Sequence, residues 1–279
     1  MRLALVVNDA AGSGADGVSR CLRAAGAEVT VHDVSDPQAA ADTAPDRIVV
    51  AGGDGSIGPA AEVAAAADLP LAVVPTGTAN DFARALGLPL ELNDACAVAA
   101  SPTARERSFD LARADGRPFL NAASAGLSVL AAARARPLKP SLGPLAYAVG
   151  ALRAGLTARP LRCRVIVDGG LLYEGKAWQV IVAGTGAFGG GAEVDAADAG
   201  DGLLDVAVLE GGPRPMLVRR AWGMRRGGLV EQDGVRHGRG RVIEVHGDEI
   251  EAFNVDGEVC TLRPARFETG RERVRVVVT

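Results

Sequence analysis

Short glycine-rich segments follow several apolar runs in the first third of this chain. The segment GGDGS at residues 52–56 directly follows the apolar run 48–51. Glycine reaches backbone angles that other residues avoid and lets a ligand approach the main chain closely. An aspartate there can hold a metal ion or a ribose hydroxyl, but a strand-to-helix turn with a capping aspartate has the same pattern. The segment alone leaves both a ligand site and a structural turn open.

Two further segments have a similar composition. NDAAGSG at residues 8–14 can present several backbone amides to a phosphate at a helix N-terminus. PTGTANDFAR at residues 75–84 follows another apolar run, and its Thr78 can bond a phosphate or a ribose. Asn80 and Asp81 are equally good helix caps. Together the segments predict a nucleotide site. The expected contacts, with Asp33 on the adenine side, are Asn8, Gly12, Ser13, Gly14, Asp33, Gly52, Gly53, Asp54, Gly55, Ser56, Thr78, Asn80 and Asp81.

A phosphate site in this chain must work without a P-loop lysine. The pattern GxxxxGK followed by Ser or Thr is absent. The charge of bound phosphates must then be offset by backbone amides, by arginine or by Mg²⁺.

The elements that position these segments alternate between strand and helix up to about residue 105. Apolar runs at residues 3–8, 28–34, 46–53 and 69–75 are separated by stretches with helical spacing. This alternation predicts a parallel sheet covered by helices. Ligands of such sheets bind at the carboxyl ends of the strands, where the glycine-rich segments lie.

The second part of the chain has a different pattern. Strand-like segments separated by DG, GG and GD turns predict hairpins and a mainly antiparallel β domain, with a helical insertion near residues 128–158. We therefore expect a nucleotide-binding α/β domain at 1–108, to which segment 262–279 could return, and a β-rich substrate domain at 109–261. The net charge is −8 over residues 1–110 and +4 over residues 111–279, which suits two domains with different partners.

Composition and charge exclude several classes of protein. The net charge of −4 argues against a nucleic-acid binder. The four cysteines lie far apart without a CxxC pair, so we expect neither a cysteine-ligated metal site nor a disulfide framework, and we expect a cytoplasmic protein. The first apolar run is too short for a signal peptide, and no run approaches the ~18–20 apolar residues of a membrane span.

The order of the motifs resembles a known family. GGDGS followed by PTGTANDFARALGLP is similar to the diacylglycerol kinase catalytic domain, and more closely to the bacterial soluble lipid kinases that resemble sphingosine kinases. Residues 8–14, FLNAASAGL at 119–127, GGGAEVDAADAGDGLLDV at 189–206 and VDGE at 255–258 match further family motifs in the same order. The resemblance implies an α/β domain like that of NAD kinases, a C-terminal antiparallel β-sandwich, and ATP with Mg²⁺ between them.

The resemblance also assigns roles to carboxylates of the second domain. Asp256 would be the general base, and Glu258 would reach the nucleotide or a water on Mg²⁺. Asp201 would hold a structural Mg²⁺ together with Asp198 and Leu203, whose backbone carbonyls complete the set. A simple hairpin is the alternative at each site, because DG turns also occur at residues 115, 168 and 233.

The implied function is ATP-dependent transfer of a phosphate to a lipid hydroxyl, most simply that of diacylglycerol. An NAD kinase of the same superfamily and a non-catalytic nucleotide- or lipid-binding protein remain alternatives. Three departures bear on this choice: Asp9 stands where the family has Pro, Ser56 replaces Thr, and Gly58 with Pro59 replaces Asn-Glu.

Two basic regions could meet a membrane surface. One combines the apolar segment 142–156 with Arg134, Arg136, Lys139, Arg153 and Arg159. The other surrounds Trp222 and Met224 with Arg219, Arg220, Arg225 and Arg226. Basic residues beside apolar ones suit peripheral contact with anionic lipid, although solvated helix faces over a buried stripe have the same pattern. The expected partners are thus ATP and a lipid substrate at the membrane surface. A homodimer is left open.

Overall fold

The computed structural model describes residues 1–7, 14–138, 145–185, 187–188, 192–193, 199–224 and 228–279. It divides into two compact units: unit 1 comprises residues 1–111 and 271–279, and unit 2 comprises residues 112–270. Strands β5 (Arg105–Ala114) and β17 (Ala265–Val278) contribute residues to both units.

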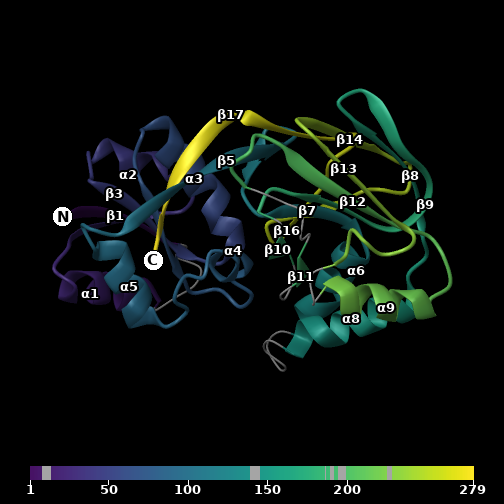
Figure 1. The fold of residues 1–279 in the computed structure, drawn as a ribbon. Coiled ribbons are helices and arrows are strands. Elements are labelled where there is room, and N and C mark those ends of the chain that lie inside the picture. The colour runs from purple at the N-terminus through teal and green to yellow at the C-terminus, as the bar shows by residue number, and fades with distance from the viewer. Residues whose placement is uncertain (8–13, 139–144, 186, 189–191, 194–198, 225–227) are drawn as a thin grey trace. The chain divides into compact units, whose positions relative to one another are not determined.

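Unit 1 is built on a parallel sheet. Its strands are β1 (Arg2–Val7), β2 (Glu28–Asp33), β3 (Arg47–Gly52) and β4 (Leu71–Pro75), in the order β2–β1–β3–β4 (Figure 1). The end of β17 pairs with β4 in parallel through Val276 and Leu71. Strands β1, β3 and β4 are apolar and buried almost throughout, as expected of a parallel sheet covered on both faces.

Helices cover both faces of this sheet. Alternate strand residues such as Leu5 and Val49 form a core with α1 (Gly14–Ala24) and α5 (Leu92–Ala100). The residues between them, such as Ile48, face the other side, where α3 (Ile57–Ala66) contacts β3 and β4. Two short helices, α2 (Gln38–Asp42) and α4 (Asp81–Ala85), and the 3-10 turn η2 (Asp54–Ser56) complete the helical elements described in this unit.

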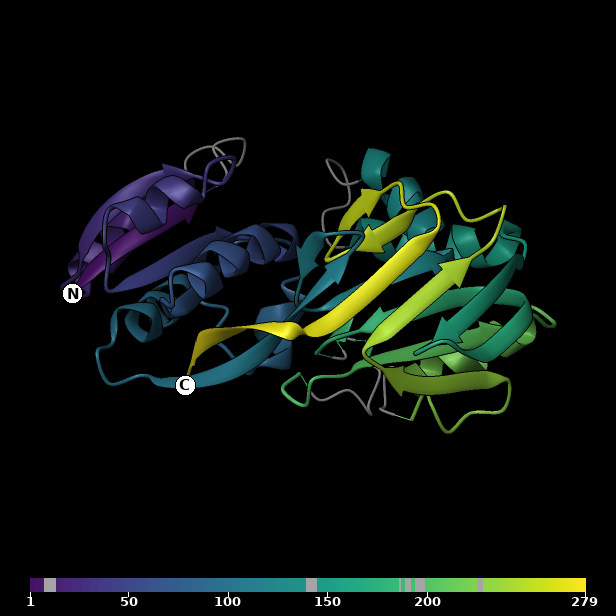
Figure 2. The ribbon, with the colours of Figure 1, turned by 90° about the horizontal axis from the view of Figure 1, so that it is seen from above.

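Unit 2 is mainly antiparallel. Its strand order is β16–β15–β7–β9–β8–β14–β17, and β12 pairs with both β9 and β13. Figure 2 shows these strands, in teal, green and yellow, from above. The strands are β6 (Arg117–Phe119), β7 (Ala122–Gly126), β8 (Leu161–Val167), β9 (Gly170–Ala183), β10 (Ala187–Phe188), β11 (Ala192–Glu193), β12 (Leu204–Glu210), β13 (Val235–Gly240), β14 (Val242–His246), β15 (Phe253–Val255) and β16 (Glu258–Cys260). The long strand β9 pairs with β8 through its first half and with β7 and β12 through its second half.

The core of unit 2 is apolar and contains three packed aromatic rings. Phe267 packs edge-on against both Phe119 and Phe253, with ring centroids 6.2 and 5.2 Å apart. Valine and alanine fill most of the remaining core, as the low aromatic content requires. The buried aromatic residues thus anchor β6, β15 and β17 in one cluster.

The described residues of unit 2 form three helices and one 3-10 turn: α6 (Leu127–Ala135), η3 (Arg136–Leu138), α8 (Leu145–Thr157) and α9 (Pro215–Met224). Helix α6 contacts β7, β9 and β15, and α8 packs on α6 (Figure 1). Among the described residues, no helix has the length and apolar character needed to cross a membrane.

Candidate active site

The carboxyl ends of the unit 1 strands meet at one edge of the sheet. In the parallel register, Val7 pairs with Asp33 on one side and with Ala51 on the other, and Gly52 pairs with Pro75. The register therefore brings together the ends of the strands from which the predicted nucleotide segments start. Asn8, Gly12 and Ser13 lie outside the described residues, and Gly14 begins α1.

The loop at residues 76–80 is tied to the end of β3 and to itself. The amide of Thr76 donates to the carbonyl of Gly52, with 3.0 Å between nitrogen and oxygen. The side chain of Asn80 accepts from the amide of Gly77 at 3.0 Å and donates to the Gly77 carbonyl at 2.9 Å. Asn80 has a φ of 50°, a left-handed conformation that asparagine tolerates better than most residues. Asn80 thus shapes this loop through its own side chain.

Two glycines of these segments touch each other through their backbones. A Cβ added at Gly77 would lie 2.5 Å from the Cα of Gly53, so packing requires glycine at position 77. A Cβ added at Gly53 would lie 3.5 Å from the Cα of Gly77, an ordinary contact. Gly53 also has a φ of −91°, which any residue can adopt. Neither packing nor backbone conformation therefore requires a glycine at position 53.

Asp54 links the two segments. Its Oδ1 accepts a hydrogen bond from the amide of Phe82 at 2.9 Å, and its Oδ2 accepts one from the amide of Asp81 at 3.2 Å. These amides are in the first turn of α4, where backbone donors lack partners within the helix. Asp54 therefore caps a helix that starts 27 positions later in the chain. The capping interpretation applies to α4 rather than to the helix that directly follows Asp54.

The remaining nucleotide candidates differ in exposure. Thr78 is exposed, Gly55 and Ser56 are half-buried, and Asp81 is buried. The carboxylate of Asp33 accepts from the amide of Ser35 at 2.8 Å and so shapes the turn after β2. Nucleotide contact by these residues stays a prediction.

In unit 2, Asp256 occupies the turn between β15 and β16. Its Oδ2 accepts from the amide of Leu120 at 2.9 Å, and its Oδ1 accepts from the amides of Asn121 and Ala122 at 3.1 and 2.9 Å. The residue is 8 % exposed. Three amides from the family-like segment 119–127 therefore hold this carboxylate in one orientation.

Comparison with other DG turns shows what is particular to Asp256. Asp115, Asp168 and Asp256 have φ values of 47°, 48° and 45°, as the first residues of tight hairpin turns. Asp115 accepts from the amide of Arg266, and Asp168 accepts from two amides at the start of β14. Amide capping is thus a shared structural device of these hairpins. Asp115 and Asp168 are exposed, however, and Asp256 is buried.

Glu258 lies two residues beyond Asp256 and forms an ion pair with Arg117 of β6. Its side chain is 55 % exposed. A role of Glu258 toward the nucleotide stays a prediction.

Asp201 has partners that sequence reasoning did not identify. Its Oδ1 accepts from the amide of Leu203 at 3.0 Å, and its Oδ2 pairs with the guanidinium of Arg239. The Nε of Arg239 also lies 3.2 Å from Asp205, which is 1 % exposed, and Nε2 of His237 lies 2.6 Å from the same carboxylate. The hydrogen bond to Asp201, with the nearby charge of Asp205, raises the pKa of Arg239. Arg239 thus bridges two carboxylates.

The described part of this turn does not fit an open cation site, because an amide and a guanidinium engage the two oxygens of Asp201. Asp198 lies outside the described residues. Within the described ranges, no group of three or more His, Cys, Asp or Glu side chains could hold a metal ion. A structural Mg²⁺ at Asp201 stays a prediction that these contacts do not favour. Arg239 lies opposite Asp205 in the pairing of β12 with β13. The sequence could have pointed to Arg239 only if the register of these two strands had been known.

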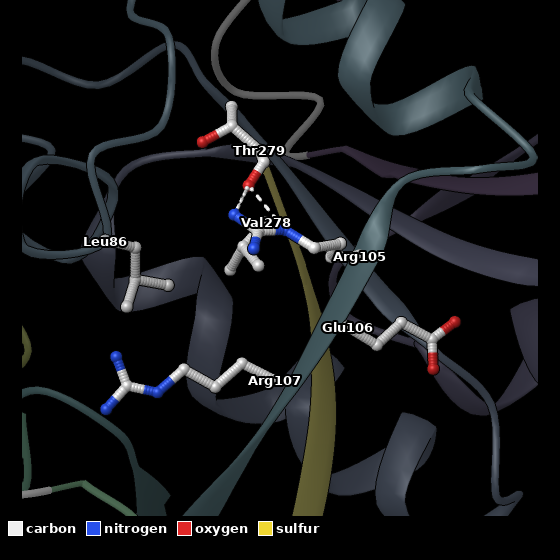
Figure 3. Close-up of a pocket in the computed structure, with 6 residues that line it drawn as sticks. All are labelled: Leu86, Arg105, Glu106, Arg107, Val278 and Thr279. Atoms are coloured by element: carbon white, nitrogen blue, oxygen red, sulfur yellow. Dashed lines mark hydrogen bonds between the residues drawn. The ribbon is translucent and has the colours of Figure 1, made fainter.

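A separate hollow of unit 1, about 360 Å³ in volume, lies where β5 and β17 run together (Figure 3). It is lined by Leu86, Arg105, Glu106, Arg107, Val278 and Thr279. Arg105 donates to the backbone oxygen of Thr279 through Nε at 3.3 Å and Nη2 at 2.8 Å. None of the residues predicted for the nucleotide site lines this hollow, so it contributes nothing to that site.

Comparison with protein families gives two adjacent matches. The model of the diacylglycerol kinase catalytic domain matches residues 2–114, and that of the YegS C-terminal NAD kinase beta sandwich-like domain matches residues 121–278. The chain is 30% identical to the diacylglycerol kinase of Bacillus subtilis over 84% of its own length and 78% of that protein. The chain belongs to the diacylglycerol kinase family.

A second relative of this chain is a Pseudomonas aeruginosa protein with the name "Probable lipid kinase YegS-like". It is 36% identical over 82% of the chain and 75% of the relative. The names of both relatives support a lipid kinase. The expected family is therefore confirmed.

Solved structures show the same fold. A diacylglycerol kinase structure from Bacillus anthracis superposes with a TM-score of 0.78 at 23% identity, covering 100% of this chain and 97% of that one. An NAD kinase from Archaeoglobus fulgidus, solved in complex with ATP, gives a TM-score of 0.53 at 15% identity, covering 99% and 93%. These likenesses show the fold alone. The expected fold class of this family member, α/β with an antiparallel β-sandwich, is confirmed.

Proposed function

We propose that this chain transfers the γ-phosphate of ATP to the hydroxyl of diacylglycerol or a closely related membrane lipid. The observation that carries the proposal is the carboxylate of Asp256, which is buried and held by three amides in the motif that the family resemblance marks as catalytic. Relatives named diacylglycerol kinase and probable lipid kinase support the lipid as acceptor.

In the proposed reaction, the oxygen of the lipid hydroxyl forms a bond to the γ-phosphorus. The bond from that phosphorus to the β,γ-bridging oxygen breaks, ADP leaves, and the hydroxyl proton passes to the carboxylate of Asp256. Phosphoryl transfer depends mainly on positioning and on charge stabilisation, because its transition state is loose. A carboxylate fixed by three hydrogen bonds suits this role, since it can hold the hydroxyl in line without moving.

ATP with its Mg²⁺ is the second substrate. We assign its phosphates to the backbone of residues 52–56 and to the hydroxyl of Thr78. Gly53 supports this assignment, because neither packing nor backbone angles require a glycine at this position. Asp54 and Asn80 would act by positioning, since their side chains bond the backbone of the same segments.

The acceptor lipid implies peripheral contact with a membrane on the side that has ATP, which is the cytoplasmic side. This location follows from the two substrates of the proposed reaction. It requires that the protein approach the headgroup region without crossing the bilayer.

A phosphate-transfer assay tests the proposal. The protein is incubated with Mg²⁺ and ATP labelled on the γ-phosphate, and is offered mixed micelles of diacylglycerol, phosphatidylglycerol or a sphingoid base, with NAD in a parallel reaction. Label in diacylglycerol is expected. Label in NAD alone would replace the proposal with an NAD kinase. Retained ATP binding with no label in any acceptor would favour a non-catalytic binding protein.

A further inference from the structure

Helix α8 buries its small residues and exposes its large apolar ones. Ala146, Gly150 and Ala154, spaced four residues apart, are buried, and Ala158 continues the same row just past the end of the helix. A Cβ added at Gly150 would lie 2.5 Å from the carbonyl oxygen of Ala131, so this row packs closely on α6. Leu152 and Leu156 are 66% and 65% exposed. Helices that cover a core normally have the opposite arrangement.

The two leucines lie on one face of α8 because they are four residues apart. That face does not point toward the strands, since α8 packs on α6, and α6 is the helix that contacts β7, β9 and β15 (Figure 1). Leu156 lines a hollow of about 520 Å³. Its lining residues are Ala133, Arg134, Pro137, Arg153, Leu156 and Thr157.

The charge of this helical region has a single sign. Residues 127–160 contain five basic side chains and no acidic one. Arg153 and Arg159 are exposed, and none of the ion pairs found in the described part of the chain includes Arg134, Arg153 or Arg159. The guanidinium of Arg134 donates to the carbonyl of Arg153 and the hydroxyl of Thr157, which joins α6 to α8 at this face.

We propose that the outer face of α8, formed by Leu152, Arg153 and Leu156, docks on an anionic phospholipid surface together with Arg159, which lies just beyond the end of the helix. The inference rests on the proposed function and deepens it, because it names the surface through which the enzyme reaches its lipid. The leucines would enter the boundary between headgroups and acyl chains, and the arginines would contact phosphates. A second copy of the chain fits this face less well, since a twofold contact would bring its unpaired arginines against one another.

Vesicle sedimentation without ATP tests the docking face. The wild type is expected to pellet with vesicles that contain phosphatidylglycerol, to pellet weakly with pure phosphatidylcholine, and to be released by salt. The double variant Leu152→Ser and Leu156→Ser should bind about tenfold more weakly, because two apolar side chains no longer leave water. Arg153→Gln with Arg159→Gln should remove most of the preference for phosphatidylglycerol.

Matched control variants are available elsewhere in unit 2. Leu171 of β9 is 55% exposed, and Arg164 of β8 is exposed, so Leu171→Ser and Arg164→Gln should bind vesicles as the wild type does. Phosphorylation of a short-chain diacylglycerol dissolved as monomers should be unchanged in the leucine variant, which verifies its fold.

The possible outcomes separate the docking face from the proposed function. Absence of lipid phosphorylation by the wild type would contradict the proposed function while vesicle binding could still be measured. Wild-type binding by the leucine variant, or equal binding to both vesicle types, would overturn the docking face. A change from dimer to monomer in the leucine variant, with vesicle binding retained, would assign this face to a second copy instead.

Discussion

The carboxylate of Asp54 accepts a hydrogen bond from the backbone amide of Phe82, with 2.9 Å between Oδ1 and the nitrogen. This contact joins the glycine-rich turn after β3 to the first turn of α4. The hydrogen bond therefore connects directly the two motifs of unit 1, residues 52–56 and 75–84, on which the family resemblance rests. A carboxylate at the start of a helix also interacts favourably with the helix dipole.

We expect Asp54→Ala to lower the free energy of unfolding by about 1–2 kcal/mol, the usual cost of losing a helix cap. ATP affinity should fall as well, because the loop at residues 76–80 leads directly into the uncapped helix. Asp54→Asn should lose less stability, since one acceptor oxygen remains. Urea unfolding and ATP titration by calorimetry measure the two effects.

Asp46 provides the control for this prediction. Its carboxylate accepts a hydrogen bond from the amide of Arg2 at 2.7 Å, at the amino ends of β1 and β3 and so at the opposite edge of the sheet from the predicted nucleotide segments. Asp46→Ala should therefore cost some stability and leave ATP affinity unchanged. Full ATP affinity in Asp54→Ala would show that the cap does not position the nucleotide site.

Gly53 and Gly77 are expected to respond differently to the same substitution. Gly77→Ala would place a Cβ 2.5 Å from the Cα of Gly53, so the two segments must move apart and stability should fall by about 1–3 kcal/mol. Gly53→Ala makes only an ordinary contact in the folded chain and should change stability by less than about 0.5 kcal/mol. If phosphates approach this backbone, Gly53→Ala should nevertheless weaken ATP binding. An unchanged dissociation constant for ATP in Gly53→Ala would move the phosphates elsewhere.

The parts of the fold that depend on local pattern could be predicted from the sequence. Apolar runs that end in glycine-rich turns indicated the parallel strands of unit 1, and the DG turns indicated hairpins at Asp115, Asp168 and Asp256. The place of the last strand has no local signal in the sequence, because the pairing of β17 with β4 joins residues about 200 positions apart.

The contacts of the candidate site were harder to predict. Asp54 reaches α4 only because β3 and β4 are neighbours in register, and Arg239 reaches Asp201 only because β12 pairs with β13. Sequence spacing contains no direct signal for either contact. The burial that distinguishes Asp256 from Asp115 and Asp168 likewise depends on packing rather than on the DG motif.

Asp256→Asn should reduce phosphate transfer to lipid by about 10²- to 10⁴-fold, because the carboxylate that accepts the proton is lost. Asparagine tolerates the left-handed backbone conformation at this position, so the turn should form. ATP binding should be retained. Steady-state transfer assays and ATP titration separate the two steps.

Asp168→Asn is the matched control for Asp256→Asn, since Asp168 has the same turn conformation and also caps backbone amides, but is exposed. Asp256→Asn should lose more stability, about 1–3 kcal/mol, because its side-chain NH2 group must replace one of the two buried oxygens that accept backbone amides. Asp168→Asn should lose less than about 1 kcal/mol, because one oxygen of the exposed Asp168 accepts both of its amides. Only Asp256→Asn should lose activity. Similar activity in the two variants would reduce Asp256 to a structural turn residue.

The guanidinium of Arg239 should stabilise unit 2 by offsetting the charge of Asp201, a role for which the family resemblance implies a magnesium ion. Removal of its guanidinium in Arg239→Ala leaves the buried Asp205 with His237 alone, and should lower the free energy of unfolding by about 1–3 kcal/mol. Arg236→Ala is the control: Arg236 is on the same strand and pairs with Glu210 at 2.6 Å, but its side chain is 62% exposed, so the cost should be about 0.2–1 kcal/mol.

Chelation distinguishes this arrangement from a resident metal ion. Because an amide and the guanidinium engage both oxygens of Asp201, EDTA should leave the Tm of the wild type unchanged in thermal unfolding without nucleotide. In Arg239→Ala the Asp201 carboxylate loses its cation, and added Mg²⁺ should then raise the Tm by binding to the folded state. A clear fall in the wild-type Tm on chelation, reversed by Mg²⁺, would instead place a structural metal ion at this turn and make the Arg239 contact secondary to it.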